Sequence, residues 1–156
     1  MLQTGDKAPD FTLLDQGGEQ LTLSSLRGET IVLYFYPRAD TPGCTTQACG
    51  IRDRGPDYEA AGVRVIGISP DEPGALKKFA AKHDLGFTLL SDPDHAVANA
   101  YGAWGEKSMY GKKYEGILRS SFIVDAEGKI ARVFPKVQPK KHDELVLKAL
   151  DELAAA

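Results

Sequence analysis

Short runs of continuous apolar residues recur along this chain between more polar stretches. Residues 30–36 (TIVLYFY) and 63–69 (VRVIGIS) are rich in β-branched and aromatic side chains, and residues 87–91 (FTLLS) form a shorter run of the same kind. Runs of this length and composition are typical of strands that are buried on both faces. The pattern therefore predicts three interior strands.

Two further segments have the periodicity of helices. Residues 72–84 form an amphipathic pattern between the second and third strands. The apolar side chains on its one face are Leu76, Phe79 and Ala80. Residues 94–102 predict a shorter helix, with Asp94 as its N-cap and Gly102 as the residue that ends it.

The C-terminal part of the chain predicts a hairpin and a closing helix. Residues 120–134 read as two strands joined by a turn at residues 125–128 (DAEG), and residues 141–154 read as a helix. The residues at helical spacing in this last segment are Leu145, Ala149 and Glu152 or Leu153. Strands that alternate with helices predict an α/β fold, in which helices flank a central mixed β-sheet. With no repeat or linker, residues 1–156 are expected to form a single domain.

Composition and charge exclude several classes of function. The formal net charge of −3 does not favour a nucleic-acid binder. No secretory signal starts the chain, and no apolar run approaches the roughly 20 residues that span a bilayer. We therefore expect no membrane segment and a cytoplasmic location. Stable disulfides are rare there, so two neighbouring cysteines favour redox chemistry or metal binding.

Both cysteines of the chain, Cys44 and Cys49, fall within residues 34–50 (YFYPRADTPGCTTQACG). A strand ends near Tyr36, a turn follows, and a helix is expected to begin around Cys44. Unpaired backbone N–H groups and the helix dipole favour a negative charge at that place. The thiolate is the reactive form of cysteine, so the position predicts a nucleophile.

The turn before Cys44 carries a hydroxyl and two prolines. Thr41 is placed to bring its hydroxyl beside the sulfur, and Pro37 and Pro42 stiffen the turn and remove backbone donors. A threonine and prolines at such a place also serve the turn alone, so both interpretations stay open.

The spacing of the two cysteines restricts how they can react with one another. Five helical steps separate their Cα atoms by roughly 8–9 Å, whereas a disulfide needs about 4.4–6.8 Å. A Cys44–Cys49 disulfide therefore requires the helix to unwind. Gly50 weakens the helix, and Gly55-Pro56 predicts a kink or a new helix start at Pro56. We hypothesise that this break makes it easier to free Cys49, although both features also occur as ordinary helix punctuation.

The residues Pro37, Thr41 and Cys44 match the pattern P-x-x-x-T-x-x-C, and in this the chain resembles the peroxiredoxins. Segments such as GDKAPDFTL, GVRVIGISPD and FTLLSDPD extend the resemblance over nearly the whole chain. The four-residue gap between the cysteines is similar to part of the bacterioferritin comigratory protein, or peroxiredoxin Q, subfamily. This resemblance implies a thioredoxin-like fold and a peroxidase that needs no metal or cofactor.

The resemblance also implies a role for each residue of the motif. Cys44 corresponds to the peroxidatic cysteine and Cys49 to the resolving cysteine, Thr41 would hold the peroxide, and Pro37 would shield the site. The family uses a distant arginine, which the segment ILRSSFIVD supplies as Arg119. Without the resemblance, an exposed arginine is the commoner explanation of that residue.

The implied reaction is the atypical 2-Cys mechanism. A hydroperoxide oxidises Cys44 to a sulfenic acid, which condenses with Cys49 to form an intramolecular disulfide. Thioredoxin or a similar dithiol reductant then reduces that disulfide by exchange. The subfamily resemblance also implies a monomer.

Two alternatives keep the cysteines but change the chemistry. A thiol-disulfide oxidoreductase without peroxidase activity would share the fold, yet such proteins generally carry CxxC. A metal site would need Cys44 and Cys49 to meet histidines, which are scattered and lack paired spacing. The histidines concerned are His83, His95 and His142. The remaining polar and aromatic candidates read as caps, turn residues or core packing: Asp92, Asp94, Asp125, Tyr101 and Trp104.

Overall fold

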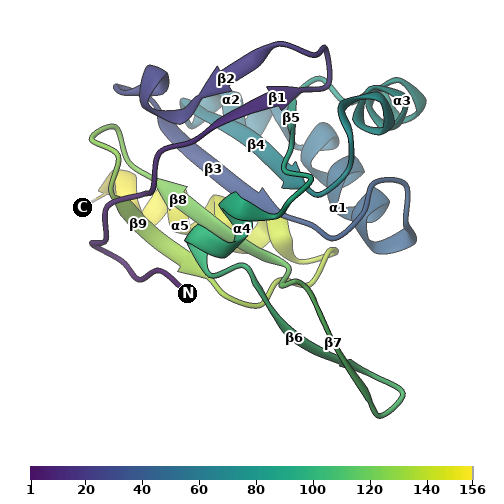
Figure 1. The fold of residues 1–156 in the computed structure, drawn as a ribbon. Helices are drawn as coiled ribbons and strands as arrows, with labels where there is room; N and C mark the ends of the chain where they lie inside the picture. Colours follow the sequence, from purple (N-terminus) through teal and green to yellow (C-terminus); the bar gives the residue numbers. More distant parts are fainter. Residues whose placement is uncertain (156) are drawn as a thin grey trace.

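The computed structural model describes residues 1–155 and contains one seven-stranded sheet and a separate two-stranded hairpin (Figure 1). The strands are β1 (Thr12–Asp15), β2 (Gln20–Thr22), β3 (Thr30–Phe35), β4 (Val63–Ser69), β5 (Thr88–Ser91), β6 (Trp104–Met109), β7 (Lys112–Ile117), β8 (Ser120–Val124) and β9 (Ile130–Phe134). The helices are η1 (Leu23–Leu26, a 3₁₀ turn), α1 (Pro42–Asp53), α2 (Gly55–Ala60), α3 (Pro73–His83), α4 (Ala96–Tyr101) and α5 (His142–Ala155).

The large sheet is mixed, as the sequence predicts. Its strand order is β2-β1-β5-β4-β3-β8-β9, with β3, β4 and β5 parallel to one another and the outer strands antiparallel. The interior strand β3 is buried along residues 31–35 because it is covered on both faces. The predicted turn between β8 and β9 is confirmed, since Asp125 Oδ1 accepts the backbone N–H groups of Glu127 and Lys129.

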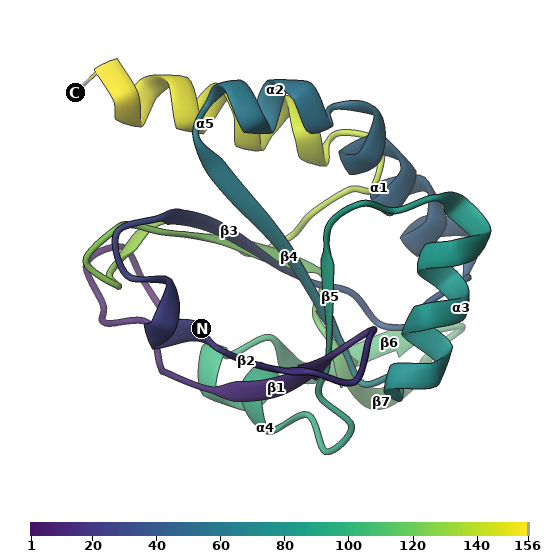
Figure 2. The ribbon, with the colours of Figure 1, turned by 90° about the horizontal axis from the view of Figure 1, so that it is seen from above.

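Helices pack on both faces of this sheet (Figure 2). On one face, α1, α2, α3 and α5 form a cluster with inward side chains of β3, β4, β5 and β8. On the other face, α4 and the segment around Phe11 close a second cluster. Helix α1 begins just beyond the carboxyl end of β3, which places its first turn at one end of the sheet (Figure 1).

The structure corrects the prediction for the closing helix. Leu145 is 46% exposed, whereas the buried stripe of α5 consists of Val146, Ala149 and Leu150. Both sets have helical spacing and share Ala149, so the periodicity alone did not decide between them. The amphipathic face of α3 is confirmed, with Leu76 and Phe79 buried.

The predicted helix over residues 94–102 is confirmed as α4, and Gly102 ends it with a positive φ of 74°. The prediction of Asp94 as the N-cap is wrong by one position, because the N-cap is His95; Asp94 Oδ1 still accepts the N–H of Ala96. The buried Asp92 carboxylate adds two bonds, from the N–H groups of Val97 and Ala98. Burial is the main cause that raises the pKa of Asp92.

Two hairpins were missing from the sequence prediction. Strands β1 and β2 pair at one edge of the large sheet, and β6 and β7 form an arm that projects from the molecule (Figure 1). The arm carries mostly exposed polar residues, so it lacks the alternation that identifies a strand. Its tip, Tyr110, is 97% exposed. Among residues 1–155, no helix is long and apolar enough to cross a membrane.

Candidate active site

The first turn of α1 positions Cys44. Thr41 is the N-cap in extended conformation, Pro42 is the first helical residue, and the Thr45 N–H closes the first turn on the Thr41 carbonyl at 2.8 Å. Cys44 is therefore the third residue of the helix, and its side chain is buried at 1% exposure. The position at the helix start favours negative charge on the sulfur.

An arginine that follows Cys44 by 75 residues in the sequence contacts this sulfur. Arg119 Nη2 lies 3.3 Å from Cys44 Sγ, and Arg119 Nη1 donates to Gln47 Oε1 at 2.6 Å. Gln47 is completely buried and lies on the same helix face as Cys44, three residues later. The guanidinium is thus fixed at two points and presents a positive charge to the sulfur.

The chain around Arg119 explains why it reaches this place. Arg119 joins β7 to β8, and its carbonyl accepts the N–H of Val137 at 3.0 Å. A Cβ at position 43 would lie 3.2 Å from Arg119 Nη2, so Gly43 leaves the room that the guanidinium occupies. Arg119 thus contacts Cys44 directly, and its role in the reaction stays a prediction.

Thr41 and Pro37 both lie in the loop that connects β3 to α1. The Thr41 hydroxyl donates to the Arg38 carbonyl at 2.8 Å, which fixes the side chain and leaves its oxygen able to accept a hydrogen bond. Pro37 is half-buried and begins the loop directly after Tyr36, whose N–H donates to the Ile68 carbonyl at 3.1 Å. The sheet thus anchors the start of the loop.

Cys49 lies on the same helix as Cys44, and both thiols are free. Cys49 is half-exposed, in contrast to the buried Cys44. Helix α1 ends at Asp53 and α2 begins at Gly55 with Pro56 in its first turn, which confirms the predicted restart. The reduced form therefore holds both cysteines in an intact helix.

Residues 4–133 match the model of the AhpC/TSA family. The chain is 52% identical to "Peroxiredoxin Bcp" of Escherichia coli (strain K12) over 153 residues, which cover 98% of either chain. It is 49% identical over 152 residues to "Putative peroxiredoxin bcp" of Haemophilus influenzae, with 97% and 98% coverage. The chain belongs to the AhpC/TSA family.

Solved structures agree with this assignment. The bacterioferritin comigratory protein of Xanthomonas campestris superposes with a TM-score of 0.90 at 36% identity, covering 97% of this chain and 99% of the other. PrxQ of Xylella fastidiosa gives 0.92 at 31% identity, with 99% and 98% coverage. The chain therefore has the thioredoxin-like fold of peroxiredoxins, and it is a thiol-dependent peroxidase.

The loop before α1 in this peroxiredoxin is tied to α3. Asp40, which has a positive φ of 62°, accepts hydrogen bonds from Lys82 Nζ at 2.9 Å and pairs with His83 Nε2 at 3.2 Å. The bonds from Lys82 and then His83 lower the pKa of Asp40. The neighbouring Ala39 N–H donates to Asp71 Oδ2 at 2.7 Å. The loop is thus held at two successive residues.

Sequence reasoning missed Gln47 beside the cysteine and one cation, Lys107, whose charge interacts with the site. Gln47 was identifiable, because a residue three positions after Cys44 in a helix shares its face. Lys107, on the β6–β7 arm, gave no such signal. Burial lowers the pKa of Lys107, and the Arg119 charge lowers it further while Cys44 acts in the opposite sense. The arm therefore contributes a cation to the electrostatic surroundings of the site.

The three histidines take part in separate local contacts. His83 pairs with Asp40, His95 stacks on the half-buried Trp104 with ring centroids 3.7 Å apart, and His142 Nε2 lies 2.7 Å from Ser121 Oγ. Within residues 1–155, no group of three or more His, Cys, Asp or Glu side chains is placed to hold a metal ion. The described side chains give the metal alternative no site.

Proposed function

We propose that Cys44 is the peroxidatic cysteine of this peroxidase. The observation that carries the proposal is the contact of 3.3 Å between Arg119 Nη2 and Cys44 Sγ at the first turn of α1. The Cys44 thiolate attacks one oxygen of the hydroperoxide, and the O–O bond breaks. The other oxygen leaves as an alcohol or water once it takes a proton, and Cys44 becomes a sulfenic acid.

The surrounding groups match the movement of charge in this step. Negative charge passes from the sulfur to the leaving oxygen, so fixed donors along that path lower the barrier. Arg119 supplies such donors, and Gln47 holds the guanidinium in place. The Thr41 oxygen is available to accept the peroxide hydrogen, since its own hydrogen is bonded to Arg38. Pro37 restricts the loop beside them.

Cys49 is proposed as the resolving cysteine. Its thiol sulfur attacks the sulfur of the Cys44 sulfenic acid, the S–O bond breaks, and the hydroxyl leaves as water with the thiol proton. Both residues lie in α1, so this step requires the helix to unwind between them. A thioredoxin-type dithiol then reduces the disulfide and is itself oxidised.

The surroundings of α1 support a substrate range that includes organic hydroperoxides as well as hydrogen peroxide. A shallow, mostly apolar cavity of about 320 Å³ opens beside the first turn, between Pro42, Thr46 and Pro139. It gives room for the organic group of a hydroperoxide. We further propose that residues 1–156 act as a single domain and a monomer in the cytoplasm, where dithiol reductants are supplied.

Coupled turnover tests this assignment. NADPH oxidation is followed with thioredoxin, its reductase and a hydroperoxide for the wild type, Cys44→Ser and Cys49→Ser. We expect Cys44→Ser to be inactive from the first turnover, and Cys49→Ser to consume one equivalent of peroxide without normal recycling. Full activity of Cys44→Ser would contradict the proposal. Insulin reduction without peroxide turnover would instead favour a disulfide oxidoreductase.

A further inference from the structure

A hydrogen bond joins α2 to α5 at the point where the cysteine helix ends. The Tyr58 hydroxyl donates to Asp143 Oδ1. Tyr58 is 3% exposed, and the Asp143 side chain is 13% exposed. Burial, together with the Asp143 charge, raises the pKa of Tyr58, so the hydroxyl keeps its proton and remains a donor. Hydrogen bonds to an ionised acceptor in such surroundings are stronger than neutral ones.

The same carboxylate lies against α1 beside Cys49. A Cβ at Gly50 would lie 2.7 Å from Asp143 Oδ2, so Asp143 occupies the space next to this glycine. Two backbone hydrogen bonds then lead from Gly50 to Tyr58. The Arg54 N–H donates to the Gly50 carbonyl at 3.0 Å, and the Tyr58 N–H donates to the Arg54 carbonyl at 3.2 Å. Asp143 therefore accepts a hydrogen bond at one end of this short path and lies against the other end.

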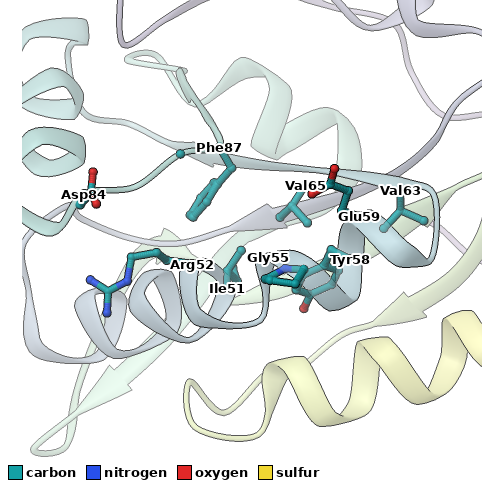
Figure 3. Close-up of a pocket in the computed structure, with 11 residues that line it drawn as sticks. Ile51, Arg52, Gly55, Tyr58, Glu59, Val63, Val65, Asp84 and Phe87 are labelled. Atoms are coloured by element: carbon teal, nitrogen blue, oxygen red, sulfur yellow. The ribbon is translucent and has the colours of Figure 1, made fainter.

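The opposite side of the same segment faces the sheet. A cavity of about 520 Å³ lies between the α1–α2 junction and the sheet, and Ile51, Tyr58 and Phe87 are among its lining residues (Figure 3). Ile51 and Tyr58 are themselves buried and pack in one cluster with Val65 of β4. The cavity limits how far this packing extends, so the bond to Asp143 adds a polar restraint to the apolar contacts of the junction.

Buried polar atoms beneath α1 destabilise its helical state and so favour its unwinding. Gln47 Nε2 and Tyr34 Oη have no hydrogen-bond partner within residues 1–155. A buried polar atom without a partner destabilises the state in which it is buried, and water satisfies it when the segment opens. The helical state of α1 is therefore opposed by its own interface and depends on ties such as Tyr58–Asp143.

We propose that Tyr58 and Asp143 are positioning residues for the disulfide step. Their hydrogen bond holds the α1–α2 junction and so sets the rate at which α1 unwinds to bring Cys49 to the Cys44 sulfenic acid. The inference rests on the proposed function, because it assumes a Cys44–Cys49 disulfide. Without the bond, the unwound state is more populated, and the sulfenic acid has less time to react with a second peroxide and become a sulfinic acid.

The test follows one oxidation cycle of the reduced full chain. Wild type, Tyr58→Phe and the matched control Tyr110→Phe are mixed with one equivalent of hydrogen peroxide, quenched with an alkylating agent and examined by mass spectrometry. We expect disulfide formation to be about tenfold faster in Tyr58→Phe, the effect of losing a hydrogen bond to a charged group. Sulfinic acid at excess peroxide should fall, and Tyr110→Phe should match the wild type.

Two further measurements separate this role from a general loss of stability. Tyr58→Phe added to Asp143→Ala should not accelerate the disulfide step further, because the bond is already absent. Amide hydrogen exchange in the reduced Tyr58→Phe protein should be faster in α1 and unchanged in β3. An unchanged disulfide rate in Tyr58→Phe overturns the inference. If wild type forms no Cys44–Cys49 disulfide at all, the proposed function fails instead.

Discussion

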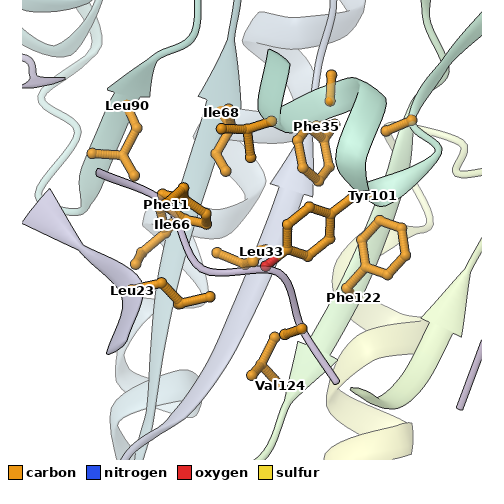
Figure 4. Close-up of a cluster of buried hydrophobic side chains, with 14 of the residues drawn as sticks. Phe11, Leu23, Leu33, Phe35, Ile66, Ile68, Leu90, Tyr101, Phe122 and Val124 are labelled. Atoms are coloured by element: carbon orange, nitrogen blue, oxygen red, sulfur yellow. The ribbon is translucent and has the colours of Figure 1, made fainter. Parts of the chain in front are cut away.

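The two faces of the seven-stranded sheet are packed with different chemistry. The face under α4 is almost wholly apolar, with Phe35, Ile68 and Phe122 around Tyr101 (Figure 4). The buried Tyr101 hydroxyl on this face is satisfied, since it donates to the Pro9 carbonyl at 2.8 Å. On the face under α1 and α5, buried polar side-chain atoms of the described residues lack partners. These atoms belong to Tyr34, Tyr36, Gln47 and His142.

Because of this difference, one face resists local opening and the other opens more easily. Apolar packing at full density resists any partial opening, so the α4 face keeps the sheet and the β3 end in place. The polar face carries the helix that holds Cys44 and that unwinds in the proposed mechanism. A segment with unsatisfied polar groups costs less to open locally than one with a dry core. In the proposed mechanism, motion is thus confined to one side of the sheet.

Truncating the apolar face should have the largest effect and should leave the chemistry unaltered. Phe122 packs against Phe35 and Tyr101, with ring centroids 5.8 and 5.4 Å away. Phe122→Ala should lower the free energy of unfolding by about 3–5 kcal/mol. Urea unfolding measures this loss, and the rate of Cys44 oxidation in the folded protein should be unchanged. Leu145→Ala, at an exposed site, should change stability by less than about 0.5 kcal/mol.

Removing Arg119 on the polar face should have the opposite effect: oxidation of Cys44 slows, whereas the stability of the fold is largely kept. Arg119→Met removes the donor to Cys44 Sγ and should slow oxidation of Cys44 by about 100- to 1000-fold, the usual effect of losing one fixed donor to developing charge. Peroxide consumption by the reduced protein gives the rate. Arg132→Met, which affects a half-exposed arginine paired with Glu152, serves as the control. A fully active Arg119→Met would remove Arg119 from the proposed mechanism.

The parts that were predictable from sequence are those encoded locally. The strands over residues 30–36 and 63–69, the helix restart at Pro56 and the placement of Cys44 each depend on neighbouring residues. The contact between Arg119 and Gln47 joins residues 72 positions apart. Only the resemblance indicated Arg119, and the helical spacing that places Gln47 beside Cys44 does not indicate that Gln47 binds this arginine. The unpartnered polar atoms of the α1 face also depend on the full packing.

The sequence prediction missed the β6–β7 arm for a different reason. It is stabilised by pairing between its own strands, from Trp104 opposite Ile117 to Met109 opposite Lys112, and little of it is buried. A hydrophobic pattern records burial, so a mostly exposed hairpin leaves almost no pattern to read. Lys107 lies on this arm, and its effect on the site could not be predicted for that reason.

A conservative change on the polar face should increase stability. Tyr34 is 1% exposed, and its hydroxyl has no partner among the described residues. Tyr34→Phe removes that unsatisfied group and should raise the free energy of unfolding by about 1 kcal/mol. Opening of α1 should slow by about fivefold, because the hydroxyl no longer gains water on release. Amide exchange in α1 measures this, and faster exchange would show that the hydroxyl stabilises the helix.

The smallest effect is expected at an exposed group of charged side chains, Asp40 with Lys82 and His83, which we call the clamp and which lies outside the interface between α1 and the sheet. Asp40 binds Lys82 and His83, whose hydrogen bonds lower its pKa in the folded protein below the usual 3.8. A lowered folded pKa means that the clamp stabilises the protein above about pH 3.8 and that this contribution disappears as the pH falls through the folded value.

The variant Asp40→Asn keeps the positive φ, which asparagine tolerates, and removes only the charge. It should be slightly less stable than the wild type in urea at pH 7, and the two should converge below about pH 3.8. Oxidation of Cys44 should slow less than in Arg119→Met, because the Ala39 N–H still ties the loop to Asp71. A stability gap that widens in acid would show that the clamp acts through another group. A rate loss as large as that of Arg119→Met would instead mean that the loop, rather than the buried interface, controls the thiol.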